Sequence, residues 1–231
     1  MKRVLVATAL AVLTLLAVPV AAATADDQQL AKAGVLRLTD FPTGWKQSAR
    51  GAGSDAKVDA EAAKIKRCKT FAEFAARNMK NPRAESPNFD LGQANVTNTV
   101  SVYPTVARAE AAIGLFVDAK MPRCLEQLFD AVTRADLQKD SSVRRQLKSV
   151  TTDVGRETGI RIGDDAVVYQ GTVDVGLKDG TSRTFGLGFV TVRVGTALVG
   201  FAYTADTDIS AALQPAIVAS VTRLQRAVPA G

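Results

Sequence analysis

GDDAVVYQGTVDVGLKDGTSRTFGLGFVTVRVGTALVGFAYT, residues 163–204, alternates apolar with polar or small residues along most of its length. This period of two is typical of β-strands, whose successive side chains point to opposite faces of a sheet. Asp179-Gly180 is the strongest hairpin-turn signal in the chain, and Val194-Gly195 marks a second turn. The stretch therefore predicts three consecutive antiparallel strands.

The middle strand is predicted to have one bulky face and one small face. Large residues, Phe185, Leu187 and Phe189, alternate there with Gly186 and Gly188. Because glycine leaves room above a sheet, we expect a helix to pack closely on the small face. The closing segment, residues 209–226, carries an apolar stripe at helical spacing and is predicted to dock on the sheet. Pro215 is expected to start or kink that helix.

The segments before residue 163 mix helices with strands. Strands are predicted from Trp45, over 95–103 and over 147–160, and helices over 26–35, 59–79, 106–119 and 122–138. Residues 49–58 and 80–88 are predicted to be loops. Together these elements predict an α+β fold, with an antiparallel sheet of about five strands flanked by helices in a single domain.

The N-terminus has the three parts of a secretory signal peptide. Lys2 and Arg3 form a short basic region, residues 4–20 are mostly apolar, and Ala23-Thr24-Ala25 is a small-residue cleavage site. We expect cleavage after Ala25, which leaves residues 26–231 as a secreted protein in the extracellular space or cell wall. An uncleaved membrane anchor is the weaker alternative, because the apolar run is shorter than the roughly 20 residues that a span needs.

The composition excludes several kinds of site. The chain has no histidine and two cysteines, which excludes Ser-His-Asp and Cys-His catalysis and histidine-ligated metals, so no cofactor is expected. Cleavage would leave 27 basic and 23 acidic residues, a net charge of +4 that does not indicate nucleic-acid binding. The basic groups at 64–69 and 144–148 are interpreted as solvated helix faces. No segment of the mature chain predicts stable membrane insertion.

Cys124 lies just after Pro122, in the first turn of a predicted helix. The free amides of that turn favour a thiolate, so a reactive thiol is one interpretation. No base or neighbouring cysteine accompanies it, however, and the one other cysteine is Cys68. In an oxidising compartment we expect a Cys68–Cys124 disulfide, which would stabilise the fold by about 4 kcal/mol.

Candidate functional side chains are few. Asp164-Asp165 is a pair of neighbouring carboxylates, but neighbours in an extended chain point to opposite faces, so the pair is interpreted as a turn that opens a strand. A ligand-binding cleft, if present, is expected to use the polar-tipped aromatic residues Trp45, Tyr103, Tyr169 and Tyr203. Each of the four also suits a core position, and no catalytic residue is predicted.

Four stretches in order, followed by a closing helix, resemble a known family: LTDFPTGW (38–45), VSVYPTVARAEAAIGLFVDAKMPRCLEQLF (100–129), RIGDDAVVYQG (161–171) and VRVGTALVGFAYT (192–204). The order is similar to that of secreted actinobacterial sensor-domain proteins, which include the extracellular domain of PknH-type kinases and LpqN-type lipoproteins. The resemblance implies an antiparallel sheet flanked by helices, disulfides, and a cleft for an unidentified ligand. It supplies no catalytic motif, and this chain lacks the kinase domain and the lipid-anchor cysteine.

Two function classes follow from these observations. The first is a secreted, non-catalytic binding or sensor-like module, whose partner would be a cell-envelope small molecule, lipid or polysaccharide, or a secreted protein. The second is a hydrolase that uses carboxylates, Ser or Lys and no histidine. The hydrolase requires acidic side chains that converge in a cleft, and the sequence alone does not show such convergence.

Overall fold

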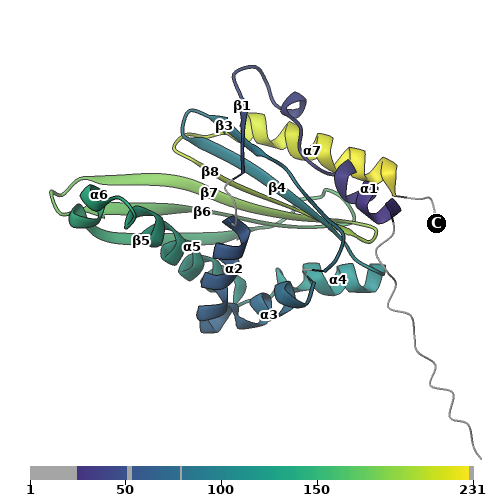
Figure 1. Cartoon of the computed structure of the whole chain (residues 1–231), viewed down its shortest axis with the longest axis horizontal. Coiled ribbons are helices and arrows are strands. Elements are labelled where there is room, and N and C mark those ends of the chain that lie inside the picture. The colour runs from purple at the N-terminus through teal and green to yellow at the C-terminus, as the bar shows by residue number, and fades with distance from the viewer. Residues whose placement is uncertain (1–24, 51–53, 79, 229–231) are drawn as a thin grey trace, which may run out of the picture.

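The computed structural model describes residues 25–50, 54–78 and 80–228, so the predicted signal peptide lies outside the described residues, apart from Ala25. Helices and strands alternate in blocks along the chain (Figure 1). The helices are α1 (Ala25–Ala33), η1 (Leu38–Asp40), α2 (Ser54–Lys64), η2 (Lys66–Cys68), α3 (Lys69–Asn78), α4 (Val106–Leu115), α5 (Met121–Leu137), α6 (Ser141–Gln146) and α7 (Ser210–Ala227). The strands are β1 (Lys46–Ser48), β2 (Arg83–Glu85), β3 (Asn88–Leu91), β4 (Ala94–Val102), β5 (Leu147–Glu157), β6 (Asp165–Leu177), β7 (Ser182–Val194) and β8 (Ala197–Ala205).

The described strands form one antiparallel sheet of eight strands, in the order β1-β3-β4-β8-β7-β6-β5, with β2 also paired to β4. The α+β class and the antiparallel pairing are confirmed, but the predicted count of about five strands is wrong. The strands that the sequence did not reveal are β2 and β3. They are three and four residues long, too short to show an alternation, and lie in or beside a segment with two prolines.

The three strands predicted from residues 163–204 are confirmed as β6, β7 and β8. Asp179-Gly180 lies in the β6–β7 turn, where Gly180 has a φ of 91°, and Gly195 has a φ of 56° in the β7–β8 turn. Most helix predictions are also confirmed. Exceptions are α6 and the short η1, which were not predicted, and α2, which begins inside the predicted loop 49–58.

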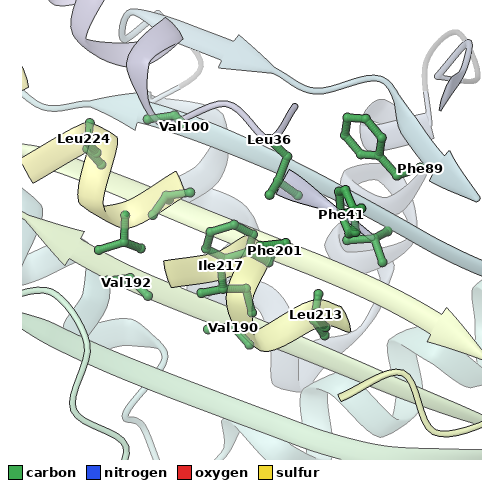
Figure 2. Close-up of a cluster of buried hydrophobic side chains, with 14 of the residues drawn as sticks. Leu36, Phe41, Phe89, Val100, Val190, Val192, Phe201, Leu213, Ile217 and Leu224 are labelled. Carbon is green, nitrogen blue, oxygen red and sulfur yellow. The ribbon is translucent and has the colours of Figure 1, made fainter. Parts of the chain in front are cut away.

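Helices cover both faces of the sheet (Figure 1). On one face, α1 and α7 close a core in which Leu213 and Ile217 of α7 pack with Val190, Val192 and Phe201 (Figure 2). The docking of the closing helix on the sheet is therefore confirmed, with Pro215 inside the helix. This core also takes in residues of β3 and β4, so it spans strands that are far apart in the sequence.

The small face of β7 is filled differently from the expectation. A side chain added at Gly188 would lie 2.1 Å from the ring of Tyr203, because the tyrosine on the neighbouring strand β8 lies across that glycine. The predicted close approach of a helix to Gly188 is therefore wrong. A cross-strand aromatic ring occupies the space, and α7 packs farther along β7, over Val190 and Val192.

The opposite face of the sheet packs against α2, α3, α4 and α5. Leu125 and Leu128 of α5 join Val154 of β5 and Leu187 of β7 in this second core. Cys68 and Cys124 form the predicted disulfide, which joins η2 to the first turn of α5 with a Cα–Cα distance of 5.0 Å. Both cysteines are buried, so the bond is an internal staple of the helical layer.

The segment 34–45, which we call the strap, crosses the first face between α1 and β1. Buried Asn98 of β4 binds it twice: its Oδ1 accepts from the N–H of Leu36 at 2.9 Å, and its Nδ2 donates to the carbonyl of Gly34 at 2.8 Å. From α7, the Ser220 hydroxyl also donates to the Gly34 carbonyl. These contacts satisfy strap backbone groups that burial would otherwise leave unpaired.

Asn98→Ala is expected to lower the free energy of unfolding by about 2–4 kcal/mol, because it leaves the Leu36 N–H buried without its acceptor and removes one donor from the Gly34 carbonyl. Asn95→Ala, on the same strand but at a half-exposed position, is the matched control and should cost less than about 1 kcal/mol. Urea unfolding of the three proteins measures the difference. Equal losses in the two variants would show that the strap does not depend on Asn98.

The Cys68–Cys124 bond should leave no free thiol in the unreduced, denatured protein. The double variant Cys68→Ala/Cys124→Ala should lose about 4 kcal/mol in the free energy of unfolding, because the bond closes a loop across a sequence separation of 56. Thiol titration and urea unfolding test these two expectations. Two titratable thiols in protein purified without reductant would contradict the Cys68–Cys124 disulfide.

Candidate functional site

A pocket of about 370 Å³ lies between α1, the start of the strap and β2. This volume falls within the range of known small-molecule sites. Its walls come from three segments of the chain: Gln28 and Lys32 of α1, Val35 and Arg37 of the strap, and Ala84 and Glu85 of β2. Val35 and Ala84 give it an apolar part, while the other four side chains are polar or charged.

Positive charge is in excess around this pocket. Lys32 and Arg37 are exposed, and neither side chain forms an ion pair with another described residue. The one carboxylate in the lining, that of Glu85, is already engaged: its Oε1 lies 2.9 Å from Nε of Arg83, and its Oε2 lies 3.8 Å from Nε of Arg50. The pocket therefore offers two unpartnered cations to a ligand, and an anionic group is the chemistry that suits them.

The walls of the pocket are held by the strap contacts. Arg223 of α7 donates to the Val35 carbonyl at 2.8 Å and forms a two-pronged ion pair with Asp40, while Asn98 holds the backbone of Leu36 between Val35 and Arg37. On the α1 side, the Gln28 side chain donates to the carbonyl of Arg83 at 3.0 Å and ties the helix to β2. The pocket is thus built on fixed backbone, and a ligand would not have to order it.

Of the four aromatic residues predicted to line a cleft, Trp45 and Tyr203 belong to the first face of the sheet. Trp45 is buried and stacks on Phe41, with ring centroids 4.6 Å apart. Tyr203 is half-buried across Gly188. Neither residue lines the pocket between α1 and β2.

Tyr103 and Tyr169 belong to the second face. Tyr103 stacks on Phe74, and the Tyr169 hydroxyl donates to the carbonyl of Phe116 at 2.5 Å. The sheet therefore separates the four aromatic residues into two pairs, and they do not converge on one cleft. The pocket residues were missed from the sequence because each of the three segments supplies only two of them, so no local spacing marks the site.

The tyrosines are poorly suited to proton transfer. Burial raises the pKa of Tyr103 to about 12, although the positive charge of Arg83 opposes the shift. Burial also raises the pKa of Tyr169 and of Tyr203. A general acid or base works best with a pKa near the operating pH, so these hydroxyls stay protonated at neutral pH, and that of Tyr169 serves as a hydrogen-bond donor.

Asp164-Asp165 opens β6 as predicted, after Gly163 with its φ of 65°. The expectation that the two carboxylates diverge is wrong, because both bind Arg193 of β7. Nε of Arg193 donates to Oδ2 of Asp165 at 2.7 Å, and its Nη1 lies 3.2 Å from Oδ2 of Asp164. Asp164 also accepts the N–H of Gly195 at 2.7 Å. The pair is engaged in a structural network that ties the start of β6 to the β7–β8 turn.

Other kinds of site find no support in the described parts of the chain. No three side chains of the metal-binding types gather there, and none of the helices there is long and apolar enough to cross a membrane. A scan against models of protein families and a search of curated proteins both found no match. The pocket between α1 and β2 is therefore assigned as the candidate site on its geometry and charge alone.

Stability at high pH should depend on Tyr103. Its pKa in the folded protein, about 12, exceeds the ordinary value of 10.0, so its contribution to stability is complete below pH 10 and is lost as the pH rises toward 12. At pH 11 the loss should be on the order of 1 kcal/mol. Tyr103→Phe should remove that part of the pH dependence, measured by urea unfolding at pH 9 and pH 11. An identical pH dependence in the variant would contradict the assignment, since other ionisations affect both proteins alike.

Proposed function

We propose that this protein is an exported, non-catalytic binding module that holds a small anionic ligand in the pocket between α1 and β2. The observation that carries the proposal is the pair of cations, Lys32 and Arg37, that line a pocket of about 370 Å³ without an ion-pair partner among the described residues. An exposed cation gains little from a distant charge in water, but two cations beside a concave apolar surface can hold a carboxylate or phosphate.

Export is supported by the basic, apolar and small-residue pattern of residues 2–25 and by the buried Cys68–Cys124 disulfide. Disulfides persist in oxidising compartments and are rare in the cytosol, so the two features agree. Export to the cell envelope, the single domain over 26–231 and membership of the sensor-domain family remain parts of the proposal. The resemblance to secreted actinobacterial sensor domains fits a ligand-binding role, because that family is expected to bind through a cleft.

The alternative function, a hydrolase without histidine, has less support. Its requirement was a pair of carboxylates that converge in a cleft. The Asp164-Asp165 pair does converge, but on Arg193, which forms an ion pair with each carboxylate. Neither residue lines the α1–β2 pocket, where Glu85 is the one carboxylate and is paired with two arginines. An acid–base pair poised for hydrolysis is thus not found in that pocket.

The test is native mass spectrometry of the protein recovered from the culture medium of its source cells. We expect wild-type protein to carry a bound compound with a carboxylate or phosphate group. The double variant Lys32→Gln/Arg37→Gln should lose it, because the pocket then lacks both cations. Two lost charge-assisted contacts should weaken binding by roughly 2–4 kcal/mol, or about 30- to 1,000-fold.

The matched control is Lys46→Gln/Arg161→Gln, which removes the same charge from two exposed positions outside the pocket and should keep the ligand. If both the pocket variant and the control variant keep the ligand, the ligand binds elsewhere on the protein. A panel of ester, phosphoester, glycoside and peptide substrates runs in parallel. Turnover that disappears when one Asp or Glu is replaced would establish the hydrolase and overturn the proposal.

A further inference from the structure

Five basic residues lie at the end of the sheet where the β6–β7 hairpin turns beside α6 (Figure 1). We call this group the basic tip, and its members are Arg144, Arg145, Lys148, Lys178 and Arg183. All five side chains are exposed. The first three are interpreted from their spacing as a solvated helix face, but the hairpin adds Lys178 and Arg183, which lie 30 residues or more farther along the chain.

Backbone pairing brings the three segments of the basic tip together. The N–H of Lys178 donates to the carbonyl of Gln146 at 2.8 Å, and Leu147 faces Leu177 across β5 and β6. Across the hairpin, Arg183 of β7 faces Val175 of β6. Because neighbouring strands are about 4.8 Å apart, the basic side chains of β5 and β7 start roughly 10 Å from each other.

The cations of the basic tip are not used within the described fold. None of the five forms an ion pair with a described residue. Three carboxylates lie within residues 140–148 and 174–184, but each binds its own segment or its hairpin partner: Asp140 binds Ser142, Asp179 binds Thr181, and Asp174 binds the hydroxyl of Thr184. The positive charge is therefore available to an external anion.

We propose that the basic tip binds an acidic polysaccharide, a polymer with carboxylate, phosphate or sulfate groups repeated along its length. The basic tip does not line the candidate pocket, and its cations on β5 and β7 start roughly 10 Å apart, farther than one small anion spans. The exposed large hydrophobic residues of the described chain lie elsewhere, at 38, 91, 106, 117, 160 and 218. The basic tip therefore has no exposed large apolar side chain to insert into a lipid surface. It also has no exposed aromatic ring to stack on a nucleic-acid base.

The test uses heparin as the probe, with the mature protein and with the triple variant Arg144→Gln/Arg145→Gln/Lys178→Gln. We expect the variant to bind heparin at least about 10-fold more weakly at low ionic strength and to elute from a heparin column at lower salt. The matched control is Lys66→Gln/Arg67→Gln/Arg108→Gln, which removes the same charge from exposed positions without ion pairs in the described chain and should bind like wild type. Equal weakening in the two triple variants would show a net-charge effect and overturn the proposal.

Two further probes separate the polysaccharide from other polyanions. Duplex DNA and vesicles of neutral lipid with anionic phosphatidylglycerol should bind more weakly than heparin at the same salt concentration. If DNA or the vesicles bind more tightly than heparin, and the triple variant weakens that binding, then nucleic acid or lipid is the ligand of the basic tip and the polysaccharide is not. The pocket variant Lys32→Gln/Arg37→Gln should keep heparin affinity, so failure of this proposal and failure of the proposed pocket function give different results.

Discussion

The packing on the first face of the sheet depends on two hydrogen bonds made by the buried side chain of Asn98. It accepts from Leu36 and donates to Gly34, so one carboxamide pairs a donor and an acceptor of the strap with β4. An apolar side chain at that position would leave both backbone groups dependent on other partners, and a buried unpaired group costs about 1–3 kcal/mol. With the strap fixed, α1 lies beside α7 and over β4, and both helices can close the same core (Figure 1).

The candidate pocket is a consequence of that arrangement. Val35 and Arg37 flank the residue that Asn98 holds, so their positions follow from the strap, while Gln28 and Lys32 follow from the docking of α1. The proposed ligand site is therefore formed where three segments meet at the margin of the sheet. The basic tip has a different origin, because it depends on the long β6–β7 hairpin and its contact with the end of α6. Two positively charged surfaces with separate structural causes suit a module that binds anionic material.

Several side chains that suggest chemistry in the sequence serve packing in the structure. Asp164 and Asp165 bind Arg193 and fix the start of β6 against the β7–β8 turn. Tyr203 fills the space above Gly188. In both cases the partner lies on a neighbouring strand, 15 residues away for Gly188 and Tyr203 and 28 or 29 residues away for Arg193 and the two aspartates, and no local pattern in the sequence indicates it. Such pairs are decided by strand register, since one residue of slip would turn each side chain to the other face.

The sequence by itself determined the α+β class, the three long strands of residues 163–204, the amphipathic helices and the pairing of the two cysteines. These features depend on local periodicity, on turn residues such as Asp179-Gly180, and on the presence of one partner for Cys124, all of which can be counted along the chain. Only the tertiary structure decided the short strands β2 and β3, the double hydrogen bond of Asn98, the pocket and the basic tip. Each of these joins residues from separate segments, and their contacts exist only after the sheet has set which strands are neighbours.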